Sequence, residues 1–100
     1  MRVSAKDKRI KALNALAPTA QAKVKGLQDH EAEKIRNIVT VLRAATDLTM
    51  ACTAHPEWRC HQHKGKVTPW SIDVQGSTRM LFEYNTKTHE ITGLRYDDPH

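Results

Sequence analysis

The chain has 100 residues, enough for one hydrophobic core but not two, and we expect a single domain over residues 1–100. It contains no apolar run long enough to span a membrane and no secretory signal pattern, so we expect a soluble, cytoplasmic protein without a membrane partner. Sixteen Lys and Arg against eleven Asp and Glu give a formal net charge of +5, which suits an anionic partner such as nucleic acid but also occurs in domains that bind none.

The first half of the chain is rich in alanine and charged residues with helical spacing. Residues 2–5, "RVSA", predict an edge strand. Ile10, Leu13 and Leu16 then form a short apolar stripe at helical spacing, and Pro18 is expected to end that helix or to start the next segment.

A stronger helix is predicted from Asp29, which we expect to be its N-cap. Gly26 is expected to separate it from a short helix over residues 20–24. Its apolar face follows the spacing i, i+3, i+4 and i+7, and consists of Ala32, Ile35, Ile38, Val39, Leu42 and Ala45. We interpret its basic side chains as a solvated surface.

After residue 50 the hydrophobic period changes to two, which predicts strands. Alternation over 70–74 and 80–84, with "QGS" between them, predicts a hairpin; "NTKTH" predicts a turn, and "EITGLRY" a third strand ending at Tyr96. With residues 58–61 as a further strand, we expect an α+β fold: two or three N-terminal helices packed on a twisted, mainly antiparallel sheet of four to five strands. Arg79 then lies on the open face of the sheet.

The segment "WRCHQHKG" over residues 58–65 raises the question of metal binding. Cys60, His61 and His63, with Cys52 or His55, have the right donor atoms, but their spacing lacks the paired pattern of structural zinc sites, and we predict no metal. The two cysteines are able to form one disulfide; we expect free thiols instead, with Cys60 in the core.

Acid–base chemistry on a phosphodiester is the better interpretation of these side chains. Cleaving RNA without a metal requires a base for the 2′-OH, an acid for the leaving 5′ oxygen, and fixed cations for the phosphorane charge. Residues of these types, scattered along the chain, are His61, Lys64, Arg79, Asp98 and His100. A cysteine nucleophile is disfavoured, because Cys60 and His61 are adjacent on an expected strand and point to opposite faces.

The order of these segments resembles a known family. "WRCHQHKG", "PWSIDVQGSTRMLFEY" and the terminal "RYDDPH" are similar to W-R-L-H-P-L-K-G, Y-W-S-V-x-V-N-G-N-W-R-I-x-F-x-F and D-Y-x-D-Y-H of HigB-type toxins, in the RelE/ParE superfamily. "MRVSAKDKRIKAL" and "GLQDHEAEKIRNIVTVLRAAT" resemble the family's first strand and helices, with an insertion of about five residues around 18–25. The resemblance covers nearly the whole chain and implies a RelE-like microbial RNase fold.

The resemblance implies the toxin of a type II toxin–antitoxin pair, a ribosome-dependent endoribonuclease that cuts mRNA in the ribosomal A site and stops translation. The family uses no metal or other cofactor: the 2′-OH attacks the scissile phosphate and leaves a 2′,3′-cyclic phosphate and a 5′-OH. By position, His61 and His100 share the acid and base roles in an order left open, Lys64 and Arg79 hold the phosphate, and Asp98 orients a histidine or a ribose hydroxyl.

The implied partners are a HigA-like helix-turn-helix antitoxin, the ribosome with its small-subunit rRNA, and mRNA. The residues expected to contact RNA are Lys6, Lys8, Arg9, Lys11, Lys66 and Tyr96. The chain departs from the family where Pro99 replaces a tyrosine, Thr78 replaces a tryptophan, and the loop before Trp70 is shorter. His63 replaces a leucine, as either a substituted structural position or an extra cation.

Two alternatives keep the same fold. One is a catalytically weak or inactive module that binds RNA or an antitoxin without cutting. The other is a ParE-like gyrase poison, which His61 and His100 argue against because such a poison needs no acid–base pair.

Overall fold

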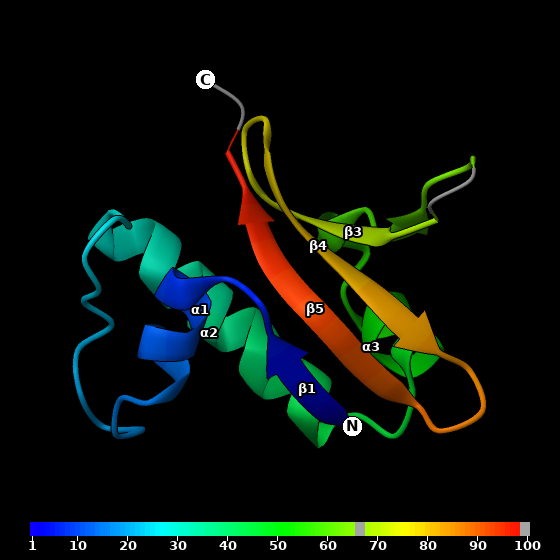
Figure 1. The fold of residues 1–100 in the computed structure, drawn as a ribbon, viewed down its shortest axis with the longest axis horizontal. Helices are drawn as coiled ribbons and strands as arrows, with labels where there is room; N and C mark the ends of the chain where they lie inside the picture. The colour runs from blue at the N-terminus through cyan, green and yellow to red at the C-terminus, as the bar shows by residue number, and fades with distance from the viewer. Residues whose placement is uncertain (66–67, 99–100) are drawn as a thin grey trace.

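A computed structural model describes residues 1–65 and 68–98 of the chain. Within these residues, three α-helices and a short 3-10 helix accompany a five-stranded sheet (Figure 1), which confirms the expected α+β fold. The elements, in chain order, are β1 Arg2–Ala5, α1 Lys8–Asn14, α2 Asp29–Ala44, α3 Leu48–Ala54, the 3-10 helix η1 Pro56–Trp58, β2 His61–Gln62, β3 Trp70–Gln75, β4 Thr78–Asn85 and β5 Glu90–Asp97.

The sheet has the strand order β1-β5-β4-β3-β2. Strands β2 to β5 form the expected antiparallel meander, and β1 adds to the far edge parallel to β5. The prediction of an edge strand at residues 2–5 and of a mainly antiparallel sheet is therefore confirmed.

The helices differ from the prediction in three places. No helix forms over residues 20–24, because so short a segment between Pro18 and Gly26 gains few helical hydrogen bonds. The N-cap of α2 is Gln28 rather than Asp29, and the Glu31 side chain accepts a hydrogen bond from the Gln28 amide at 3.0 Å.

The third difference is α3, which lies in the half of the chain where we expected strands, so the helices are not all N-terminal. Asp47 caps this helix by accepting a hydrogen bond from the Met50 amide at 2.8 Å. Trp58, expected in a strand, ends η1 and is buried. Arg59 then adopts a left-handed backbone with φ 48°, which turns the chain so that the strand begins at His61.

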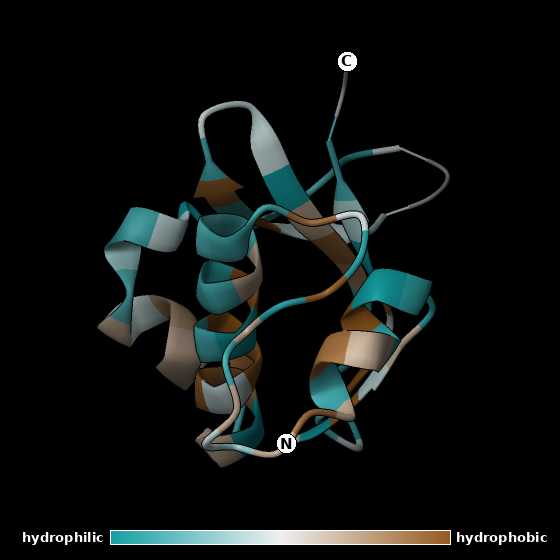
Figure 2. Cartoon of the chain, turned by 90° about the vertical axis from the view of Figure 1, so that its left-hand side faces the viewer, coloured by the Kyte–Doolittle hydropathy of each residue, from teal (hydrophilic) through white to brown (hydrophobic). Residues whose placement is uncertain are grey.

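One hydrophobic cluster joins the helices to one face of the sheet. The helices contribute Ile10, Leu13, Ile35, Leu42 and Leu48, and the strands Ile72, Met80, Phe82, Ile91 and Leu94, all almost fully buried. Figure 2 shows hydrophilic residues on the outer side of the helical layer and hydrophobic residues on the strands behind it. No helix in residues 1–65 and 68–98 is long and apolar enough to cross a bilayer.

A bulge in β5 decides which of its residues face the helices. The pairing of β4 with β5 shifts between Leu81↔Arg95 and Glu83↔Thr92, and Gly93 lies in the shift with φ +65°. A Cβ at Gly93 would lie 3.2 Å from Glu83 Oε1, so glycine suits both the backbone conformation and the close approach. Because of the extra residue, Ile91, Leu94 and Tyr96 face the core, while Asp97 faces the open side.

Asp7 ties the start of α1 to the end of β5. Its carboxylate accepts hydrogen bonds from the Arg9 amide at 2.8 Å, the Arg9 guanidinium at 2.8 and 3.1 Å, and the Tyr96 amide at 3.1 Å. Burial alone would raise the pKa of Asp7, but these hydrogen bonds and the Arg9 charge outweigh it and lower the pKa from 3.8 to about 2.

This lowered pKa predicts an acid-sensitive contribution to stability. The contribution is complete above the unfolded pKa of 3.8 and is lost as pH falls through the folded value of about 2; it amounts to about 2 kcal/mol. We expect Asp7→Asn to lower the free energy of unfolding by about this amount at pH near 5 and to flatten its pH dependence below pH 4. Urea unfolding across this range measures both effects.

The matched control is Asp29→Asn, because Asp29 is 70% exposed and pairs with exposed Lys23 at 3.5 Å. We expect a change within about 0.5 kcal/mol for this variant. Equal losses for the two variants would contradict the role assigned to Asp7.

Candidate active site

The open face of the sheet gathers polar side chains from four strands. Cross-strand pairing aligns His61 with Ser71, Asp73 with Arg79, and Arg79 with Asp97. Residues paired in this way point to the same face of a sheet. The alternate residues Ile72 and Met80 are buried under the helices, so this polar row lies on the side away from the core.

His61 is exposed, and the carbonyl of Arg59 orients its ring. Nδ1 lies 2.8 Å from the Arg59 carbonyl oxygen, which only accepts, so Nδ1 carries the hydrogen. The Nε2 lone pair of the neutral ring is then available to take a proton. The buried Ser71 hydroxyl lies 3.4 Å from both ring nitrogens and supports the ring from the neighbouring strand.

His63 lies on the same face as His61. The sequence alone left open whether His63 is a substituted structural position or an extra cation. Its ring stacks on the ring of His61 with centroids 5.0 Å apart and planes 15° from parallel. Its amide donates to the Pro69 carbonyl at 2.8 Å, which extends the β2–β3 pairing. Its Nε2 is buried and has no hydrogen-bond partner among the described residues. Two imidazoles therefore lie side by side at the edge of the open face.

Arg79 is held by a carboxylate, and that carboxylate belongs to Asp97. Arg79 Nε lies 3.4 Å from Asp97 Oδ2, and the side chains are 38% and 41% exposed. Strands about 4.8 Å apart with a rise of about 3.4 Å per residue place the Cα atoms of His61 and Arg79 about 12 Å apart. Both side chains extend from one face, and this span leaves room for a phosphodiester between them.

Asp98, which we expected in the site, lies on the other side of β5. It is half-buried, and its charge acts on Arg9 and on Tyr96, whose ring is in the core. The bulge at Gly93 brings Asp97, the residue before Asp98, to the face of Arg79.

The residues expected to contact RNA divide into two groups. Lys6, Lys8 and Lys11 are exposed, as is Lys64 in the loop after β2. Arg9 is instead bound to Asp7, donates to the Tyr96 carbonyl at 3.1 Å and lies over the Tyr96 ring.

The expectation that Tyr96 contacts RNA is wrong, because its ring is only 5% exposed. Its hydroxyl donates to the buried Glu31 carboxylate, and burial followed by this hydrogen bond raises the pKa of Tyr96 to about 12. The same hydrogen bond lowers the pKa of Glu31. Tyr96 therefore joins β5 to α2 and presents no face to a base. Lys66 and His100 lie outside the described residues.

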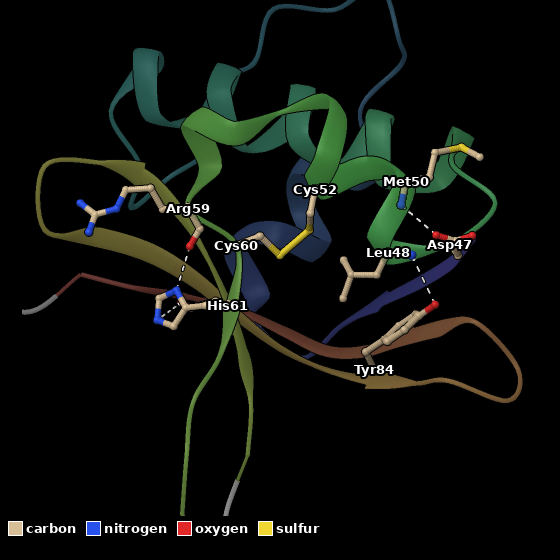
Figure 3. Close-up of a disulfide and its surroundings, with 9 residues drawn as sticks. Asp47, Leu48, Met50, Cys52, Arg59, Cys60, His61 and Tyr84 are labelled. Atoms are coloured by element: carbon tan, nitrogen blue, oxygen red, sulfur yellow. Dashed lines mark hydrogen bonds between the residues drawn. A yellow bond between two sulfur atoms is a disulfide. The ribbon is translucent and has the colours of Figure 1, made fainter.

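Cys52 and Cys60 form a disulfide, so the expectation of free thiols is wrong. Their Cα atoms are 5.9 Å apart, inside the range that a disulfide requires. Figure 3 shows the bond between Cys52 on α3 and Cys60, with the His61 ring on the opposite side of the chain from this bond. Both cysteines are half-buried against the core, as expected for Cys60.

No cluster of three or more His, Cys, Asp or Glu side chains suited to a metal ion occurs in the described parts of the chain. No protein-family model matches the sequence, and the search of curated proteins gave no match.

The contact with Arg59 predicts the tautomer of His61. In the neutral ring, at a pH of about 8, we expect hydrogen on Nδ1 and none on Nε2. Two-bond ¹⁵N–¹H correlation spectra of the imidazole rings measure this directly.

His89 is the control, because its Nδ1 lies 2.7 Å from the Tyr84 hydroxyl, which donates as readily as it accepts and so forces neither tautomer. A neutral His61 ring with hydrogen on Nε2 would contradict the assignment.

Proposed function

We propose that the protein is the toxin of a type II toxin–antitoxin system, a ribosome-dependent endoribonuclease that cuts mRNA in the ribosomal A site without a metal. The observation that carries the proposal is the alignment of His61 and Arg79 on the open face of the sheet. An imidazole and a guanidinium on one face, with exposed Lys64 nearby in sequence, supply a proton acceptor and fixed positive charge for a phosphodiester.

In this mechanism His61 Nε2 takes the proton from the 2′-OH, since its Nδ1 is committed to the Arg59 carbonyl. The 2′ oxygen attacks the phosphorus, the bond to the 5′ oxygen breaks, and a 2′,3′-cyclic phosphate and a 5′-OH result. We assign protonation of the 5′ oxygen to His100, the second histidine of the resemblance. Lys64 and Arg79 stabilise the phosphorane, Arg79 through its planar fork.

Asp97 has a positioning role in this mechanism, which differs from the role expected for Asp98, the orientation of a histidine or a ribose hydroxyl. Its carboxylate holds the Arg79 side chain beside the site, and the arginine retains free donors because it carries five N–H groups. The ion pair is partly exposed, so exchange of the carboxylate for a phosphate has a small cost.

The proposed partners are the small-subunit rRNA of the A site, the mRNA and a HigA-like antitoxin, and the proposed location is the cytoplasm. The exposed residues Lys6, Lys8 and Lys11 would contact rRNA, and docking would weaken as salt rises. A module that binds RNA without cutting is the second candidate, because Arg79 is already paired and Pro99 stands where the family has a tyrosine.

The first functional prediction concerns His61 and Arg79. Purified protein added to ribosomes on a defined mRNA should produce new 5′ ends within the A-site codon. His61→Ala and Arg79→Ala should each lower the cleavage rate by about a hundredfold or more, through loss of proton transfer or of phosphorane stabilisation.

The controls are His89→Ala and Arg95→Ala. Arg95 is on the same face of the sheet but pairs with Glu83 at 2.9 Å, and His89 is in the turn at the other end of β4. Both should cleave at close to the rate of the unmodified protein. Ribosome binding without any cut by the unmodified protein would reject the nuclease and support the binding module.

The second functional prediction concerns His100. Removing this one residue should abolish cleavage, because the proposed acid of the reaction is lost. A truncated protein that cleaves at the full rate would remove His100 from the mechanism and assign the acid to another group. His63→Leu then tests whether the stacked ring is that group.

A further inference from the structure

We propose that the Cys52–Cys60 disulfide is a thiol–disulfide exchange site through which a small dithiol controls the placement of His61. The effect on cleavage rests on the function proposed above, whereas the effect on the placement of the histidine does not. The resemblance gives no reason to expect this bond, since the family motif has leucine where this chain has Cys60.

The disulfide acts on the two residues that surround Cys60. Arg59, in a left-handed conformation, supplies the carbonyl that orients the His61 ring, and Cys60 lies between them. Its sulfur is bonded to Cys52 on α3, which packs against the core through Leu48 and Ala51. The cross-link therefore ties the segment that carries the imidazole to the rigid helical layer (Figure 3).

Strand β2 has little else to hold it in place. It contains His61 and Gln62, pairs with β3 along one edge, and both of its side chains are exposed. A short edge strand of this kind opens easily, because few backbone hydrogen bonds and little apolar surface stabilise it. Loss of the tether would therefore loosen His61 more than any residue of β4 or β5.

Cys52 is half-buried and borders a hollow that opens to solvent. Cys52 lines an open hollow of about 270 Å³ together with Leu48, Thr49, Thr53 and Trp70. A hollow of this size admits a small thiol but not a folded protein domain. The reagent class that fits is a low-molecular-weight dithiol.

The exchange begins when a thiolate of the dithiol attacks the sulfur of Cys52 and forms a mixed disulfide. The bond to Cys60 breaks, and the Cys60 thiolate leaves and takes up a proton. The second thiol of the reagent then attacks the reagent's other sulfur, which is bonded to Cys52 in the mixed disulfide, and Cys52 is released as a thiol. Two electrons pass from the dithiol to the protein, and the reagent ends as a cyclic disulfide.

The compartment decides which thiol state is populated, and the tether on His61 decides which state is active. The reducing pool of the cytoplasm proposed for this protein keeps most thiols reduced. The cross-linked form would then accumulate under oxidising conditions, and it is the form in which His61 is held for catalysis. Oxidation raises the activity of the site and reduction lowers it.

The test compares the full-length protein before and after treatment with dithiothreitol. Iodoacetamide labelling and intact mass establish the thiol state of each sample. Hydrogen exchange then follows the His63 amide, which donates to Pro69 across the β2–β3 edge. We expect its exchange to accelerate by about tenfold or more on reduction. Amides of β4 that pair with β5 are the internal reference and should change far less.

Cleavage of mRNA on the ribosome by the same two samples gives the second readout. We expect the cleavage rate of the reduced protein to be at least about tenfold lower than that of the disulfide-bonded protein. Displacement of a catalytic group by about 1 Å is enough for such a loss. The double variant Cys52→Ser, Cys60→Ser should resemble the reduced protein and ignore dithiothreitol. A Thr49→Ser variant beside the same hollow should respond as the unmodified protein does.

The outcomes separate the two proposals. Equal His63 exchange in both thiol states, or two alkylated thiols in the protein kept under air, would overturn the exchange site. Faster exchange with equal cleavage would overturn its control of the reaction. Faster exchange with no cleavage by either sample would reject the nuclease and retain the control of His61 placement.

Discussion

The carboxylate of Asp7 is the contact on which the arrangement of this protein depends. It caps α1, binds the Arg9 guanidinium and accepts a hydrogen bond from the amide of Tyr96, so one half-buried group joins the first helix to the last strand. With Tyr96 fixed in this way, its hydroxyl meets Glu31 on α2 and the next residue, Asp97, faces Arg79 on the opposite side of the sheet. The stability of the helical layer and the position of Arg79 thus share one anchor.

The two faces of the sheet use charge differently. On the covered face, the buried Glu31 and the buried Tyr96 bind each other. The lowered pKa of Glu31 and the raised pKa of Tyr96 both lie outside the range where imidazoles titrate. On the open face three arginines have a carboxylate neighbour: Arg59 lies 3.8 Å from Asp73, Arg79 3.4 Å from Asp97 and Arg95 2.9 Å from Glu83. These partly exposed pairs are weak.

The sequence predicts those parts of the fold in which local pattern and tertiary packing agree. Alternating residues along β3 and β4 predict the hairpin and place Arg79 on the open face, since nothing interrupts their period. Prediction fails where the backbone departs from regular geometry. The bulge at Gly93 sets which residues of β5 face the open side and places Asp97 there, and the turn at Arg59 takes Trp58 out of a strand. The disulfide was missed because two cysteines with ordinary spacing carry no signal of their contact, and composition favours free thiols.

The two-residue length of β2 also has a consequence for how the protein behaves at high concentration. An edge strand with a long row of unpaired amide and carbonyl groups is a template for pairing with other chains. Strand β2 offers only the backbone of His61 and Gln62 before the chain turns away, and both side chains are polar. The shortness of this edge strand therefore makes it a poor starting point for aggregation.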